Sequence, residues 1–174
     1  DEGLPMVSGK TIRGLLRDAW LSMEDHFPEL KQAAMRVLGV GRDLGESSIL
    51  RVGDAHVNRE VRDWVRSAIH EQKLTSRQVL SALTDVRYQT SQERTTGGPE
   101  PHSLRSSRVI VRGITLNAGL IWLDEPTPAD LRVLAMCVLA VRHAGLSSTR
   151  GRGHVCFKLD NDAQLTRELA QLGR

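Results

Sequence analysis

The segment TPADLRVLAMCVLAVRHAGLSSTRGRGHVCFKL, residues 127–159, contains in succession a helix pattern, a glycine-rich loop and an apolar run. Thr127 and Asp130 are spaced as a capping box, proline stands at the first helical position, and apolar residues follow at helical spacing. The pattern predicts a helix that ends at Gly145, and the apolar run Val155–Leu159 predicts a strand. A helix and a strand joined in this way indicate a domain in which helices cover a sheet.

The loop between these two elements has the composition of an anion-binding segment. Residues 145–155 include three glycines, two serines, one threonine and two arginines, and no acidic residue. Glycine allows positive φ and close approach of backbone amides to a ligand, and the guanidinium groups of Arg150 and Arg152 match phosphate oxygens. The loop therefore indicates binding of an anionic polymer such as nucleic acid. A solvated helix-to-strand turn would have a similar composition.

Length and composition indicate a globular protein. The chain has 174 residues, of which 40% are hydrophobic and 26% charged, and this is enough for one domain with an insertion. No run approaches 18 apolar residues and no signal-peptide pattern opens the chain, so we expect no membrane association. Cys137 and Cys156 have no partner at metal-ligand spacing, and we expect both to be reduced core thiols in the cytoplasm.

The first helix is predicted to begin at Ser8, because Ser8 can cap it and an apolar stripe follows as far as Met23. Its first turns carry Lys10, Arg13 and Arg17. Cations are unfavourable at the positive end of a helix, so the segment Ser8–Thr11 indicates an anion site. A solvated basic face is the alternative.

The other patterns predict a helix at 28–39, a strand at 49–55, two short helices within 58–83, strands at 108–111 and 114–123, and a helix at 165–172. The polar segment 87–104 is too long for a plain turn and is expected to be a loop. This order predicts an α+β fold. Residues 1–57 and 105–174 would form a ferredoxin-like core around the insertion 58–104. The first strand of that core would be missing before Gly3, or supplied from outside the chain.

Three motifs, in this order, resemble the RAMP superfamily of CRISPR-associated proteins. Leu4–Arg17 is similar to the family's "Pro-x-Ile-Pro-Gly-Ser-Ser-Leu-Lys-Gly-x-Leu-Arg" segment, with serine in place of the second proline. Residues 87–105 resemble the "Thr-Ala-Ile-Asp-Arg-x-Thr-Gly" segment of type III members, with Glu93 in place of the aspartate. Thr149–Gly153 matches the glycine-rich "Ser-Arg-Gly-x-Gly" loop. The strand Ile49–Ala55 also resembles the family's central strand, which ends in Asp-Ala.

This resemblance implies an RNA-recognition-motif-like core that binds guide RNA within a type III CRISPR antiviral effector complex, with the insertion as a thumb-like projection over the RNA. The implied partners are CRISPR guide RNA, target RNA and other effector subunits. Guide RNA of any sequence must be held, so contacts should go to phosphate and sugar. The residues implied to contact RNA are Ser8, Gly9, Lys10, Thr11, Arg13, Arg17, Gln89, Thr90, Arg94, Thr95, Thr96, Arg108, Arg150, Gly151, Arg152 and Gly153.

Catalysis is not assigned from the sequence. The family's metal-dependent aspartate precedes the first motif, where Asp1 could be a remnant of that loop, and Asp54 is expected to be structural. No histidine or acid cluster has metal-ligand spacing, so we expect no metal and no cofactor. His143 and His154 flank the arginine loop and could act on a 2′-hydroxyl. An RNA-binding subunit is the preferred hypothesis. The alternatives are an endoribonuclease of the same superfamily that cleaves guide precursor or target RNA, and a protein–protein module without RNA contact.

Overall fold

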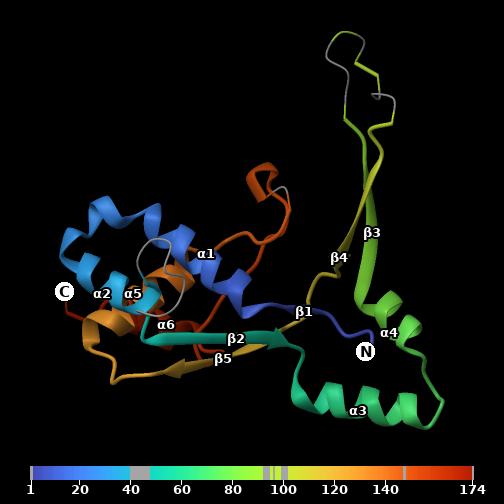
Figure 1. The fold of residues 1–174 in the computed structure, drawn as a ribbon, viewed down its shortest axis with the longest axis horizontal. Coiled ribbons are helices and arrows are strands. Elements are labelled where there is room, and N and C mark those ends of the chain that lie inside the picture. Colours follow the sequence, from blue (N-terminus) through green and yellow to red (C-terminus); the bar gives the residue numbers. More distant parts are fainter. Residues whose placement is uncertain are drawn as a thin grey trace. The chain divides into compact units, whose positions relative to one another are not determined.

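The computed structural model of the chain describes residues 2–39, 48–91, 95, 97–98, 102–146 and 148–173, and at Thr149 the backbone only. The chain divides into two compact units, one of Asp1–Val7 and Ala55–Asn117, the other of Ser8–Asp54 and Ala118–Arg174. Figure 1 shows the helices and strands of both as a ribbon. Within the described part of the chain no helix is long and apolar enough to cross a membrane. The sequence-based boundaries, a core of 1–57 and 105–174 with 58–104 inserted, remain a prediction.

The core of the second unit forms around helix α5, Pro128–Ala140, whose residues Val133, Leu134, Ala135, Cys137 and Val138 are buried. Three further helices pack against α5: α1 (Gly9–Leu21), α2 (Lys31–Leu38) and α6 (Ala163–Leu169). Two short 3-10 turns, η1 (Glu24–His26) and η2 (Pro28–Leu30), lead into α2. The buried apolar stripes of the helices, which include Leu16 of α1 and Val37 of α2, supply the hydrophobic driving force for this unit.

Helices α1 and α5 begin where the sequence predicts. Ser8 accepts a hydrogen bond from the backbone N–H of Thr11, and Thr127 forms the predicted capping box with Asp130. Gly39 ends α2 with φ of 81°, as expected for a glycine at that position. The predicted end of α5 at Gly145 is wrong, because the helix stops at Ala140, where the following valine takes an extended conformation.

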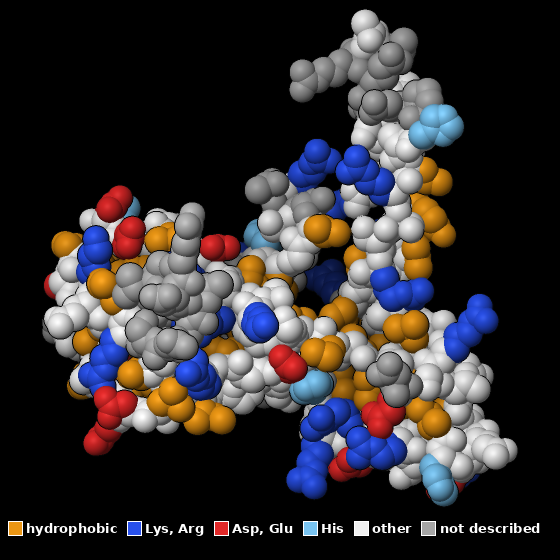
Figure 2. All heavy atoms as spheres, in the orientation of Figure 1, with side chains coloured by type: hydrophobic (Ala, Val, Ile, Leu, Met, Phe, Trp, Pro, Cys, Tyr) orange, Lys and Arg blue, Asp and Glu red, His pale blue; other side chains and the backbone are white. Residues whose placement is uncertain are grey.

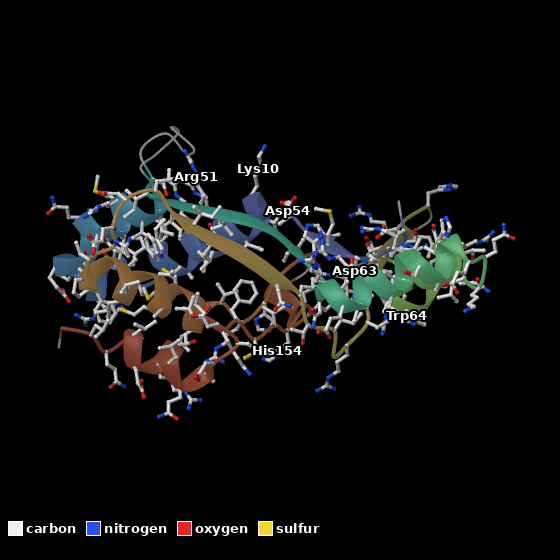
Figure 3. All side chains as sticks on the ribbon, turned by 90° about the horizontal axis from the view of Figure 1, so that it is seen from below. Lys10, Arg51, Asp54, Asp63, Trp64 and His154 are labelled. Atoms are coloured by element: carbon white, nitrogen blue, oxygen red, sulfur yellow. The ribbon has the colours of Figure 1, made fainter. Side chains whose placement is uncertain are left out.

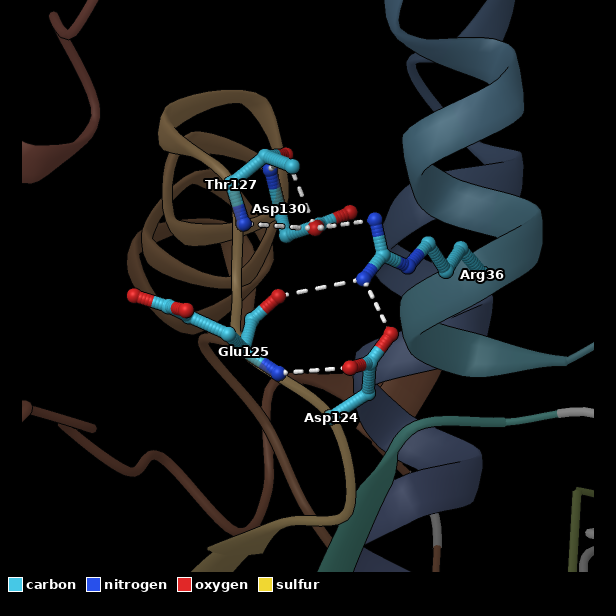
Figure 4. A network of polar contacts seen from close by, with 5 residues as sticks. All are labelled: Arg36, Asp124, Glu125, Thr127 and Asp130. Carbon is cyan, nitrogen blue, oxygen red and sulfur yellow. Dashed lines mark hydrogen bonds and ion pairs between the residues drawn. The ribbon is translucent and has the colours of Figure 1, made fainter.

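An ion-pair network joins α2 to the start of α5 (Figure 4). Arg36 Nη2 donates to Asp124 Oδ2 at 2.7 Å and to the Glu125 carbonyl at 3.1 Å, while its Nη1 lies 3.5 Å from Asp130 Oδ2. The same Oδ2 accepts hydrogen bonds from the backbone nitrogen and the hydroxyl of Thr127, both at 2.8 Å. The network therefore fixes the turn that leads into α5.

A three-stranded sheet has the order β1-β2-β5, with β1 at Met6–Val7, β2 at Leu50–His56 and β5 at Asn117–Trp122. β1 pairs antiparallel with the end of β2. β5 is also antiparallel to β2, because Leu123 N donates to the Ile49 carbonyl at 2.7 Å and Gly119 faces Gly53 further along β2. Helices with antiparallel sheets confirm the predicted α+β, ferredoxin-like class. The two-residue β1 lies on the edge of β2 away from β5.

The predicted strand Val155–Leu159 is wrong. Among the described residues, this segment makes only isolated bridges at its two ends, His143 with His154 and Leu159 with Asp162. Its backbone amides find other acceptors: Val155 N donates to the Arg142 carbonyl, and Leu159 N donates to the Thr166 hydroxyl. The outer edge of β5, the side away from β2, has no described strand hydrogen-bonded to it, so residues 155–159 do not join the sheet there. Cys156 is consequently exposed, and its prediction as a core thiol is also wrong.

The first unit consists of two helices and a long hairpin. Helices α3 (Arg59–His70) and α4 (Ser76–Leu83) confirm the two predicted helices. β3 (Thr84–Gln89) follows α4 directly and pairs antiparallel with β4 (Arg105–Ile110). The predicted loop 87–104 is therefore wrong over its first three residues, which continue β3 and pair with residues 105–107 of β4. Beyond the ribbon, Ser91 N donates to the Ser103 hydroxyl at 3.0 Å.

Candidate nucleic-acid interface

Two arginines of the second unit, Arg51 and Arg17, lie close enough to Arg13 to lower its pKa. The pKa of Arg13 is lowered by burial and also by the positive charges of Arg51 and Arg17. Arg13 Nη2 donates to the Leu38 carbonyl at 2.9 Å, which holds the group in place at the end of α2. Guanidinium groups gathered on one part of the surface favour the approach of an anion. We call Arg13, Arg17 and Arg51 the arginine cluster.

Lys10 extends the basic surface at the start of α1. In Figure 3, Lys10 and Arg51 lie on the same side of the second unit, and Asp54 lies beyond Lys10 toward the end of β2. Arg51 was not predicted as a site residue, although it is exposed next to the buried Leu50 in β2. That alternation is the signal for a solvent-facing strand residue. That Arg51 lies near Arg13 of α1, however, is evident only once the chain is folded.

The helix amides at Ser8–Thr11 are largely used within the chain. Gly9 N donates to Asp54 Oδ1 at 2.8 Å, and Thr11 N donates to the Ser8 hydroxyl at 3.2 Å. A side chain at Gly9 would collide with the Val52 carbonyl, so glycine is required for this close packing of α1 on β2. Asp54 has the structural role expected for it. Side chains such as Lys10, more than backbone amides, are therefore what this segment offers to an anion.

The arginine loop is closed at its base and open at its tip. Ala144 N donates to the Gly153 carbonyl at 2.9 Å, and Gly151 N donates to the Ser148 carbonyl at 3.0 Å after the 3-10 turn η3, Ser148–Arg150. Both glycines have positive φ, 73° at Gly151 and 67° at Gly153. A Cβ at Gly153 would collide with the Ala144 carbonyl, whereas one at Gly151 would meet open space. Gly153 thus closes the loop, and Gly151 leaves its tip accessible.

Arg150 and Arg152 are exposed on this loop, and neither forms an ion pair with any described residue. At the base of the loop, the rings of His143 and His154 meet edge to face, with centroids 5.7 Å apart. In Figure 3, His154 lies across β2 and β5 from Lys10. No group of three or more metal-ligating side chains occurs in the described ranges. An acid–base role for the two histidines stays a prediction.

The remaining predicted residues belong to the hairpin of the first unit. Gln89 ends β3 opposite Arg105, and Thr90 and Thr95 are exposed beyond it. Arg108 Nη1 donates to the Thr84 hydroxyl at 2.9 Å, so this arginine supports the base of the hairpin. Arg94 and Thr96 lie outside the described residues. The structure thus divides the predicted site residues between the two units.

The hairpin also carries apolar side chains that face solvent, as Figure 2 shows. Tyr88 is 68% exposed and Leu104 is 65% exposed, and Val109 and Ile110 are also exposed. A two-stranded ribbon with both faces in water is marginal by itself. Exposed apolar groups at this density are typical of a surface that contacts another macromolecule.

No protein-family model matches the chain, and no curated protein matches it either. The fold is similar to that of chains in two solved structures. One is described as the cryo-EM structure of the Type III-B Cmr-beta bound to cognate target RNA: TM-score 0.62, 12% identity, 95% of this chain and 86% of that chain covered. The other is described as Type III-B Cmr-beta in the apo state: TM-score 0.61, 11% identity, 91% and 85% covered. At these identities the likeness establishes a shared fold.

Proposed function

We propose that this chain is an RNA-binding subunit of a type III CRISPR effector complex that holds the sugar-phosphate backbone of guide RNA. The arginine cluster carries the proposal, because it brings the guanidinium groups of Arg17 and Arg51 close to that of Arg13, and such a concentration of cationic side chains suits a polyanion. The fold shared with Cmr-beta chains supports the same role.

Each part of the proposed interface has a chemical task. Lys10, Arg17 and Arg51 neutralise phosphates along the face of α1 and β2. Arg150 and Arg152 hold phosphate from the open tip of the glycine loop, with guanidinium forks that match two oxygens at once. On the first unit, Gln89 and Thr90 near the end of the β3–β4 hairpin offer hydrogen bonds to phosphate and sugar oxygens. Contacts to phosphate and sugar carry no sequence information, so binding should be independent of sequence.

RNA retention during purification tests this proposal. The wild-type chain, purified at low salt from cells that express its CRISPR locus, should carry nuclease-sensitive RNA. Arg17→Gln combined with Arg51→Gln should lose most of it, because two phosphate contacts are removed. Lys31→Gln combined with Arg77→Gln removes the same charge from exposed sites outside the interface and serves as the control. Wild-type protein that is free of RNA would contradict the proposal and favour a protein–protein module.

A further inference from the structure

A pocket of about 230 Å³ opens on the second unit beside α5 and α6. Its lining combines four apolar side chains with two basic ones and one amide: Phe27, Met136, Leu139 and Ala170 with Arg132, Arg167 and Gln171. No residue predicted to contact RNA lines it. The pocket therefore requires an explanation of its own.

Arg132 is a buried cation with too few partners. The residue is 7% exposed, and its Nε is buried without a hydrogen-bond acceptor in the described part of the chain. Its other contacts are weak: Nη1 lies 3.9 Å from Glu29 Oε1, and Cζ lies 6.0 Å from the centroid of the Phe27 ring. Buried guanidinium groups are ordinarily paired and hydrogen-bonded, because an unmade bond leaves the desolvation cost uncompensated. Arg132 is therefore an incompletely paired cation in the lining of the pocket.

Arg167 adds a second positive charge to the same lining. It lies on the exposed face of α6 and forms no ion pair with a described residue. Glu29 is the one described acid that approaches either arginine, and its side chain is 57% exposed. Two cations with one carboxylate, 3.9 Å from Arg132, leave a net positive site. The ligand that complements it is an anion.

The apolar lining narrows the class of anion. Apart from the two arginines, Gln171 is the one side chain of the lining that can hydrogen-bond a phosphate or a ribose, whereas Phe27, Met136 and Leu139 favour burial of methylene groups. A planar guanidinium fork matches the two oxygens of a carboxylate. The volume is below that of pockets for drug-sized ligands, so the stem must be short. We propose that this pocket binds a carboxylate on a short apolar stem.

Such a carboxylate has two sources, a free short-chain acid or a glutamate side chain of a partner protein, and calorimetric titration of the full chain separates them. Hexanoate represents the free acid, and the blocked tripeptide acetyl-Ala-Glu-Ala-amide represents the side chain. Either probe should bind, and the tighter one identifies the source. Hexanamide, which lacks the charge, should bind at least about tenfold more weakly than hexanoate. Binding of inorganic phosphate or a short RNA in place of both carboxylates would overturn the proposal, as would no binding at all.

Substitutions then test the assignment of the pocket. Arg132→Gln and, separately, Arg167→Gln should each weaken the better probe at least about tenfold, since each removes a charge-assisted hydrogen bond. Glu29→Gln should strengthen it, because the competing carboxylate is gone. Arg77→Gln, an exposed arginine of the first unit, should have no effect. If Arg132→Gln lowers the melting temperature too far for titration, Arg167→Gln and Glu29→Gln still decide. Unchanged affinity in both would refute the site.

Discussion

Cys137 and Cys156 have opposite surroundings although both belong to apolar stretches of sequence. Cys137 is buried in α5, and burial raises the pKa of its thiol to about 12 from an ordinary value of 9.0. Cys156 is exposed, in the segment that does not form a strand. Because the thiolate is the reactive form, reactivity should follow exposure and pKa.

The native protein at pH 8 should therefore take up one equivalent of iodoacetamide, at Cys156, and a second only after denaturation. A Cys156→Ser variant should take up none in its native state. Mass spectrometry of the labelled peptides provides the measurement. Burial of Cys137 also adds a pH dependence: its contribution to stability is present below pH 9.0 and is lost as the pH rises toward 12, since the unfolded thiol ionises first. Rapid native labelling at Cys137 would contradict this.

At the scale of the secondary-structure elements, Arg36 connects α2 to the start of α5. Asp130 is 1% exposed and shares Oδ2 between Arg36 and Thr127. Arg36→Met should lower the free energy of unfolding by about 2–3 kcal/mol, less than for a fully buried pair because Arg36 remains partly exposed. Urea denaturation of Arg36→Met, Asp130→Asn and the double variant measures the coupling. The double variant should cost less than the two single costs added together; simple additivity would show that the pair does not interact.

Helices were predictable from the sequence where their signals are local. The capping residues Ser8 and Thr127 set the starts of α1 and α5 without reference to the rest of the fold. Strands were less predictable, because a strand forms only where a neighbouring strand supplies backbone hydrogen-bond partners. The polar β3 has such a partner in β4, whereas the apolar run Val155–Leu159 has none among the described residues.

The same distinction applies to the candidate interface. Arg150 and Arg152 could be predicted as exposed because the glycines and serines around them determine a loop. Arg51 could not, because its proximity to Arg13 depends on β2 lying beside α1. The intramolecular use of the Gly9 amide by Asp54, 45 residues away, was also beyond local sequence patterns.

Salt dependence tests the function on the scale of the whole molecule. Binding of single-stranded RNA should be little affected by its sequence, and the logarithm of the association constant should fall linearly with the logarithm of salt concentration. Each neutralised phosphate contributes about −0.7 to that slope, so Arg150→Ala with Arg152→Ala should reduce its magnitude by about 1.4. Fluorescence anisotropy at several salt concentrations measures it. A flat salt dependence, or an unchanged slope in the double variant, would exclude the phosphate contacts.

The outer edge of β5 has a consequence for solvent exchange. Amides along an antiparallel strand point alternately to its two sides. Those that point to β2, as Leu123 N does toward Ile49, are protected. The amides between them face the edge along which no described strand lies, and they exchange their hydrogens with deuterated water on a much shorter timescale. Along β5, protection therefore alternates residue by residue, and a strand added at this edge would be visible as the disappearance of that alternation.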